Sequence, residues 1–271
     1  MAISNFIESV WSAALLEPFR SSQYLIPAVN HQYEGELASG NTVKVTAITT
    51  PAIQNYATGR ILTIDALSDT TQSLVINKED AISFKVDDVD RTQSAGSFEP
   101  VTRDAAKALA ENAELNLLVD LKANGTSAGT GAITTPDLAY AAVVAIRQAM
   151  VKAKVPSSDR VLAVSPEFAS LLLGSASKLT SYDPVGDDPI RNGVLGRLLG
   201  FTVVEHPLLT HTSNRPCAVG VHGPSVGYVG QIQKVEAGRM ELAFADYVRA
   251  LNVYGTKVLR ATAVQTYLPA S

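Results

Sequence analysis

Cysteine and histidine, the residues that most often build disulfides and metal sites, are scarce in this sequence. Its 271 residues include one cysteine, Cys217, which excludes an intrachain disulfide framework and a zinc cage made of cysteines. We expect no metal and no other cofactor, because the four histidines share no metal-ligand spacing. Each is expected to lie on the surface or in a turn: His31, His206, His211 and His222.

Charge is also sparse, and neither sign dominates strongly. Charged residues make up 18% of the sequence, against roughly 25% in a typical soluble domain. The 22 basic and 26 acidic residues give a formal net charge of -4, which argues against a general nucleic-acid binder because such proteins carry a basic excess. Interface cores are depleted of charge, so the composition favours a protein that buries surface against partners.

Long apolar runs are missing, and no targeting signal is visible. A membrane-spanning helix needs a run of about 18 or more apolar residues, and the sequence has none of that length. Residues 1–19 lack a basic region and carry Glu8 and Glu17, so they do not resemble a signal peptide. We expect a protein that is soluble and intracellular when it is made, with no membrane contact.

The N-terminal segment predicts a short amphipathic helix. Apolar residues recur at helical spacing over residues 3–15, which include Phe6 and the single tryptophan, Trp11. Ser4 is a suitable N-cap and Pro18 a suitable stop. The helix either packs on its own domain or forms an arm that packs on a neighbour. The irregular stretch that follows, residues 21–40, favours the arm.

Residues 41–90 predict strands, among them a long hairpin whose turn lies at residues 57–60. The strands on both sides of the turn are mostly Thr, Ala, Ile, Gln and Asn, so they lack the density of apolar side chains typical of a buried sheet. An isolated two-stranded hairpin is marginally stable in water. This hairpin therefore needs a surface to lie on, either on its own chain or on a neighbouring copy.

The rest of the chain predicts helices and strands in a mixed order. A long helix is expected over residues 101–121, where apolar residues step by four, and a linker with a domain boundary over residues 125–135. An α/β pattern follows, with a short helix expected at residues 194–199. Strands are expected at residues 240–244 and 247–253, with Gly255 as a turn before the last strand.

Two motifs suggest chemistry, and neither is complete. Residues 223–227 fit the G-x-S-x-G pattern of a serine hydrolase, but no helix start follows Ser225 and no histidine lies beyond His222. A strand-end turn is the better interpretation, and a hydrolase stays a distant alternative. A calcium loop over Asp88, Asp90, Thr92 and Glu99 lacks the glycine that its sixth position requires.

Four stretches, in this order along the chain, resemble the major capsid proteins of tailed bacteriophages of the Hong Kong 97 type: residues 40–45, 84–94, 193–204 and 253–260. The resemblance implies an α+β fold, the Hong Kong 97-like capsid fold. It has an N-terminal arm, an extended β-hairpin loop, a peripheral domain with a long spine helix, and an α/β axial domain. The corresponding segments are 1–40 for the arm, 41–80 for the loop, 81–133 and 236–271 for the peripheral domain, and 134–235 for the axial domain.

The resemblance also implies a function without catalysis. The protein would self-assemble into pentamers and hexamers that form an icosahedral head shell around double-stranded DNA, held without sequence-specific binding. It would be made in the bacterial host cytoplasm and end in the virion capsid. A separate scaffolding protein, a portal and a decoration protein are the further partners expected, and an encapsulin-type nanocompartment shell is the close alternative. By location, the residues expected to be buried between subunits are Phe6, Trp11, Tyr56 and Arg60.

Overall fold

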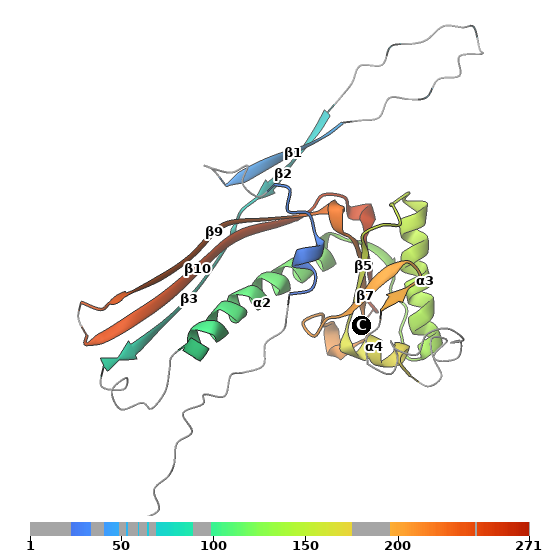
Figure 1. The fold of residues 1–271 in the computed structure, drawn as a ribbon. Coiled ribbons are helices and arrows are strands. Elements are labelled where there is room, and N and C mark those ends of the chain that lie inside the picture. The colour runs from blue at the N-terminus through green and yellow to red at the C-terminus, as the bar shows by residue number, and fades with distance from the viewer. Residues whose placement is uncertain are drawn as a thin grey trace, which may run out of the picture.

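The computed structural model describes residues 23–33, 41–48, 53, 59, 64, 69–88, 99–174, 196–241 and 243–270. The α-helices of this part of the chain are α2 (Glu99–Asn124), α3 (Pro136–Lys152) and α4 (Pro166–Leu172). The strands are β1 (Thr42–Ile48), β2 (Asp69–Val75), β3 (Lys78–Asp87), β4 (Thr126–Gly129), β5 (Arg160–Val164), β6 (Arg197–Leu198), β7 (Phe201–Glu205), β8 (Ala218–His222), β9 (Val226–Arg239), β10 (Ala245–Val258) and β11 (Val264–Tyr267). They form sheets of two, three and six strands (Figure 1).

A long antiparallel sheet in the order β3-β10-β9 carries α2 along one face (Figure 1). The 26 residues of α2 span about 39 Å and include the predicted helix with a few more residues at each end. Its expected apolar face is buried at Ala105, Ala113, Leu117 and Leu121. The step of four along the sequence therefore identified the side that packs on the rest of the chain.

A partly buried polar network fastens α2 to this sheet. The hydroxyl of Tyr254 donates to Oδ2 of Asp80 at 2.7 Å, and Nδ2 of Asn116 donates to the same hydroxyl at 2.6 Å. Asn112 on the same helix donates to Asp80 at 2.7 Å. Burial raises the pKa of Tyr254 above its ordinary value, so the phenol stays a donor. The network fixes how α2 lies over β3 and β10.

The six-stranded sheet, in the order β4-β11-β8-β5-β7-β6, has helices on both faces. Leu162 and Val164 of β5 pack with α3 and α4, whereas Ala163 packs with the cluster that contains the second half of α2. This alternation is that of a strand covered on both sides. Both α3 and α4 have side-chain N-caps: Thr135 accepts from the backbone of α3 and Ser165 from that of α4.

Two expected elements differ from the structure around residues 194–204 and 125–135. The predicted helix at 194–199 is wrong for its described part, because β6 and β7 pair there as a hairpin joined by Leu199 and Gly200. Both joining residues have positive φ, 52° and 87°, which is the geometry of a two-residue hairpin turn. Within the predicted linker, residues 126–129 form β4, which pairs with β11.

The C-terminal strands also begin and end elsewhere than expected. The described residues of 240–244 lie between β9 and β10 and outside both strands, and the Met240 N–H donates to the Ala245 carbonyl at 3.0 Å. Gly255 lies inside β10 and is not a turn. A Cβ at this position would lie 2.5 Å from the carbonyl oxygen of Val75, so the glycine permits a close approach of two backbones.

Candidate subunit-contact surfaces

The hairpin of β1 and β2 is attached to the rest of the molecule at its root. The two strands pair antiparallel from Thr42 opposite Val75 to Ile48 opposite Asp69. A small apolar cluster holds the root: Val43, Leu74, Ile76, Val229 and Val253. Beyond the cluster the hairpin leads away from the three-stranded sheet (Figure 1). Polar residues of both strands are exposed there, as Thr46 and Gln72 are.

Two residues of β10 determine where the hairpin leaves the body of the subunit. The backbone of Gly255 approaches Val75 and Ile76 so closely that a side chain would not fit. Nζ of Lys257 donates to the carbonyl of Ser73 at 2.7 Å. These contacts fix the root of the hairpin, so the rigid three-stranded sheet orients the hairpin.

Two fully exposed isoleucines lie toward the other end of the hairpin. The exposed fractions of Ile53 and Ile64 are 103% and 96%, and both are β-branched apolar residues. Burying an isoleucine side chain contributes about 1.5–3 kcal/mol of free energy, and an exposed isoleucine does not make this contribution. The expected contact residues in this segment, Tyr56 and Arg60, lie outside the described residues. The two isoleucines flank the predicted turn. They were not among the contact residues expected from the sequence, although apolar residues beside an exposed turn are a signal of a contact.

The chain leading from the N-terminal segment is attached to α2 through a buried carboxylate. Oε1 of Glu114 accepts hydrogen bonds from the backbone N–H groups of Tyr24 at 3.0 Å and Leu25 at 2.6 Å, and Oε2 accepts from Ile26 at 3.2 Å. Nε2 of His206, which follows β7, lies 3.0 Å from Oε1. Glu114 and His206 are both fully buried. One side chain thus joins the chain at residues 24–26, α2 and the six-stranded sheet.

The hydrogen bonds at His206 assign its protons. The N–H of Leu208 donates to Nδ1 at 3.2 Å, so Nδ1 is an acceptor and the proton lies on Nε2, facing Glu114. Burial by itself raises the pKa of Glu114, but the hydrogen bonds from His206 and from the backbone of residues 24–26 outweigh it and lower the pKa. Glu114 is therefore an ionised carboxylate held by four N–H donors.

The expectation that every histidine lies on the surface or in a turn needs correction. His206 is fully buried, and His222 has an exposed fraction of 8%. The reason is pairing: His206 donates to Glu114, and Nδ1 of His222 lies 2.8 Å from the hydroxyl of Ser225. Buried polar groups are stable where hydrogen bonds replace water.

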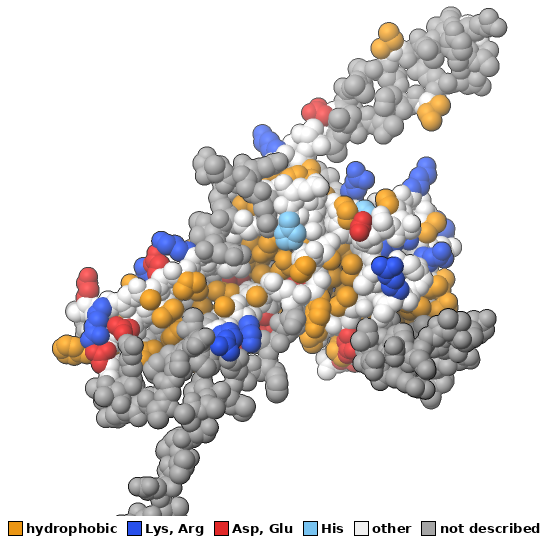
Figure 2. Space-filling model, viewed as in Figure 1, with side chains coloured by type: hydrophobic (Ala, Val, Ile, Leu, Met, Phe, Trp, Pro, Cys, Tyr) orange, Lys and Arg blue, Asp and Glu red, His pale blue; other side chains and the backbone are white. Residues whose placement is uncertain are grey.

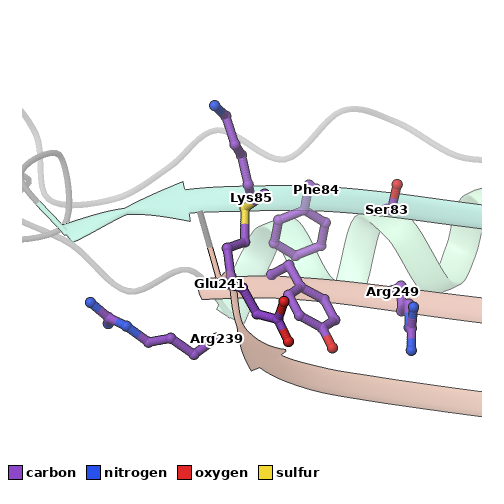
Figure 3. Close-up of a pocket in the computed structure, with 8 residues that line it drawn as sticks. Ser83, Phe84, Lys85, Arg239, Glu241 and Arg249 are labelled. Atoms are coloured by element: carbon purple, nitrogen blue, oxygen red, sulfur yellow. The ribbon is translucent and has the colours of Figure 1, made fainter. Parts of the chain in front are cut away.

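The face of the three-stranded sheet opposite α2 carries charged side chains. Ser83, Lys85, Tyr247 and Arg249 alternate with residues that face the helix. Lys85, Arg239 and Arg249 spread around an open hollow of about 750 Å³ at the end of the sheet (Figure 3). Acidic and basic side chains gather at this end of the molecule (Figure 2).

Ion pairs give this face a fixed pattern of charge. Glu236 contacts Arg249 at 2.6 Å and Lys234 at 2.5 Å, and its pKa is lowered by the hydrogen bonds from both. Arg239 pairs with Asp88 and, at 3.4 Å, with Asp246. Exposed pairs of this kind contribute little to stability. They do orient charge, which gives an interface its specificity.

Exposed apolar residues lie on two further surfaces. At the turn between β9 and β10, Phe244 is 81% exposed. On α3, the side chains of Leu138, Val144 and Val151 stand exposed on the side away from the six-stranded sheet. An isolated subunit thus presents hydrophobic side chains at several places, a property typical of surfaces that are covered by other molecules.

The serine of the G-x-S-x-G pattern is part of a turn. Gly223–Ser225 forms one turn of 3-10 helix between β8 and β9, and the Ser225 side chain is 4% exposed. Its carbonyl accepts from the N–H groups of Leu259 and Arg260. Burial lowers the pKa of His222, the partner of Ser225. The expected strand-end turn is therefore what the chain forms here.

The described residues contain no group of three or more His, Cys, Asp and Glu side chains placed to hold a metal ion. In the candidate calcium loop, Asp88 is paired with Arg239, and Asp90 and Thr92 lie outside the described residues. None of the helices in the described ranges is long and apolar enough to span a membrane. The expected contact residues Phe6 and Trp11 also lie outside the part of the chain that the structure describes.

Comparisons with known proteins match this chain to one family. The model of the phage capsid protein family matches residues 69–267. The comparison with curated proteins gives no match. Among solved structures, a chain from Mycobacterium phage Che8 is 40% identical, with a TM-score of 0.88 and 98% of each chain covered.

Two more distant structures share the fold. A chain in the capsid structure of the Cyanophage P-SCSP1u is 15% identical with a TM-score of 0.83, and the match covers 100% of this chain and 95% of that one. A chain in the asymmetric unit of the bacteriophage PhiM1 mature capsid is 14% identical with a TM-score of 0.74, over 97% and 92% of the two chains.

Proposed function

The chain belongs to the family of phage capsid proteins and is a structural protein of the phage head shell, and we propose that its copies assemble as pentamers and hexamers into a closed icosahedral shell around double-stranded DNA. The observation that carries this proposal is the β1–β2 hairpin, which is fixed at its root and exposed beyond it. An extended hairpin of this kind gains stability where a neighbouring copy supplies the missing surface.

In the shell, the hairpin lies across the adjacent subunit. Ile53 and Ile64 are buried there, together with Tyr56 and Arg60 near the turn. The support is the full exposure of both isoleucines and the polar composition of the strands between them and the root. Head-to-tail contacts of this kind close into rings when the rotation between subunits fits. Many weak contacts per subunit then add up to a stable shell.

The N-terminal arm supplies a second contact between subunits, with Phe6 and Trp11 as its apolar anchors. It comprises residues 1–40, and the amphipathic pattern of residues 3–15 supports it. Removing residues 1–20 is expected to impair shell closure while the subunit stays folded. Normal particles from the truncated protein would contradict this role.

The division into domains is part of the same proposal. The peripheral domain comprises 81–133 and 236–271, the axial domain 134–235, and the loop 41–80. Strand pairing supports two adjustments: β9 pairs with β10 from Val226 onward, and β11 pairs with β4 and β8 in the six-stranded sheet. The peripheral sheet would then begin at 226, and residues 264–267 would belong to the axial part.

The other partners follow from the shell role. A separate scaffolding protein directs assembly, a portal occupies the shell, and a decoration protein binds outside. DNA is enclosed without sequence-specific contact, which agrees with the net charge of -4. The protein is made in the bacterial host cytoplasm and has no enzymatic activity or cofactor.

Electron microscopy of the purified protein tests the proposal directly. Closed particles built from five-fold and six-fold clusters are the expected result. A compact monomer of 28.7 kDa that forms no larger body under any assembly condition would overturn it. Particles that enclose a protein cargo instead of DNA would favour the encapsulin-type alternative.

A further inference from the structure

An open groove runs between the first half of α2 and the free edge of the three-stranded sheet. It has a volume of about 450 Å³, and its apolar lining includes Ala106, Leu109 and Ala110 of α2, Val235 of the edge strand β9, and Ala250 of β10. The side chain of Val235 is 67% exposed beside it. The groove is therefore an apolar surface beside β9, which is the last strand of this sheet in the part of the chain that the structure describes.

The described segment of residues 23–29 leads toward this groove, with its N-terminal end, residue 23, nearest to the groove. Leu25 and Val29 pack in the cluster that contains Leu117 and Leu121 of α2. Glu114, about two turns closer to the start of α2, then binds the backbone of residues 24–26.

Gln23, the first described residue, lies another turn along. Its side chain donates to the carbonyl of Ala110 at 3.1 Å, and it lines the groove itself. The segment thus runs antiparallel to α2 and ends, at residue 23, in the mouth of the groove.

We propose that the groove is the docking site of the segment just before it in the same chain, residues 16–22, with Phe19 and Leu16 as its apolar anchors. Phe19 is four residues from Gln23, a reach of about 14 Å in extended chain. The groove floor from Ala110 to Ala106 is about 6 Å long. A cavity of about 150 Å³ holds a benzene ring, so the groove accommodates two to three apolar side chains.

Docking of this segment determines where the arm becomes free. With residues 16–22 in the groove, the amphipathic residues 3–15 start near the N-terminal end of α2 and not at Gln23. The Glu114 contacts and the docked segment together would then set the direction in which the arm reaches a neighbour. The docking itself does not depend on shell formation and is measurable on the unassembled subunit.

Limited proteolysis with trypsin tests the docking. Arg20 is the sole lysine or arginine before Lys44, so trypsin can cut the N-terminal segment only after Arg20. The Val235→Glu variant places a charge on the exposed wall of the groove, where the fold tolerates it. Cleavage after Arg20 is expected to be at least about tenfold faster than in the unaltered protein, because cleavage follows the population of the undocked segment.

The matched control is Val151→Glu, the same substitution at an exposed apolar position of α3. It is expected to leave the cleavage rate unchanged. Equal rates in all three proteins would overturn the proposal, as would equal acceleration by both substitutions, which would report a general loss of stability.

A cysteine pair identifies which copy supplies the segment. The Phe19→Cys, Val235→Cys double variant is expected to form a disulfide within one chain under mild oxidation. Cys217 stays out of the reaction because it is buried and burial raises the pKa of its thiol to about 11. A mixture of the two single variants is expected to give no covalent dimer. Dimers in that mixture would show that a neighbouring copy fills the groove, and no disulfide in either sample would show that residue 19 is elsewhere; both results overturn the proposal.

Discussion

Nε2 of His206, the residue after β7, lies 3.0 Å from Oε1 of Glu114 on α2 in a fully buried contact between residues 92 apart in the sequence. The same carboxylate accepts the N–H groups of residues 24–26. Three segments from distant parts of the chain therefore meet at one charge, and the position of the N-terminal segment depends on it.

The first prediction concerns the carboxylate itself. Glu114→Gln keeps the size of the side chain but replaces one acceptor oxygen with an NH2 group that faces N–H donors. At least one buried donor then loses its partner, so we expect the free energy of unfolding of the unassembled subunit to fall by about 2–4 kcal/mol. Urea unfolding measures this. The control is Glu111→Gln, a partly exposed position on the same helix, with an expected change below about 1 kcal/mol.

The second prediction is a pH dependence with a definite sign. The pKa of Glu114 is lower in the folded protein than its ordinary value. Its contribution to stability is therefore fully present above the ordinary glutamate pKa of about 4.3 and is lost as the pH falls through the lower, folded value. The difference in unfolding free energy between the unaltered protein and Glu114→Gln is expected to be constant from pH 6 to 8 and to shrink below about pH 4. A difference that grows on acidification would contradict this assignment.

The sequence predicted the elements that local pattern determines. The step of four over residues 101–121 identified the buried face of α2, and the alternating residues after Asn41 predicted a hairpin, whose root β1 and β2 form. The Glu114–His206 contact was missed because the two residues are 92 apart, and neither neighbouring sequence indicates the other as a partner. Glu114 follows Ala113 on the buried side of α2, and a charge at such a position is the signal that a partner is needed.

Glycine was the other source of error. From the sequence we interpreted Gly255 as a turn and the residues before Gly200 as a helix. A glycine in the sequence fits a turn and a close approach of two backbones equally well, because its missing side chain permits both. Gly200 has a positive φ and ends a hairpin turn, whereas Gly255 lies in β10 under the backbone of Val75. Only the tertiary arrangement separates the two cases. The expected contacts of Phe6, Trp11, Tyr56 and Arg60 stay predictions, because these residues lie outside the part of the chain that the structure describes.

The third prediction concerns the exposed isoleucines of the hairpin. Ile53→Asp and Ile64→Asp are expected to change the unfolding free energy of the isolated subunit by less than about 0.5 kcal/mol, since both side chains are fully exposed. Assembly should suffer, because a buried isoleucine contributes about 1.5–3 kcal/mol to each contact, a factor of about ten or more in the equilibrium. Sedimentation of assembly reactions measures the yield of shells. Ile53→Leu serves as the control, and shell yields equal to those of the unaltered protein in both Asp variants would remove these residues from the contact.

The fourth prediction tests whether Gly255 orients the hairpin. Gly255→Ala places a Cβ 2.5 Å from the Val75 carbonyl and 3.0 Å from the Cα of Ile76, so the root of the hairpin must shift. Overpacking against backbone costs about 1–3 kcal/mol, and urea unfolding of the subunit should register it.

A shifted root also points the hairpin in a different direction, so shell yield should fall by more than the loss of stability alone explains. Gly131→Ala is the matched control, because its Cβ meets the terminal hydroxyl of Tyr267 at 3.0 Å, and the end of a side chain can move where backbone cannot. If Gly255→Ala and Gly131→Ala lower stability and shell yield equally, the close approach at Gly255 has no special part in orienting the hairpin. For Gly255→Ala we expect a loss of shells larger than its loss of stability explains, since each hairpin that leaves its root at a wrong angle fails to reach the surface of the next subunit.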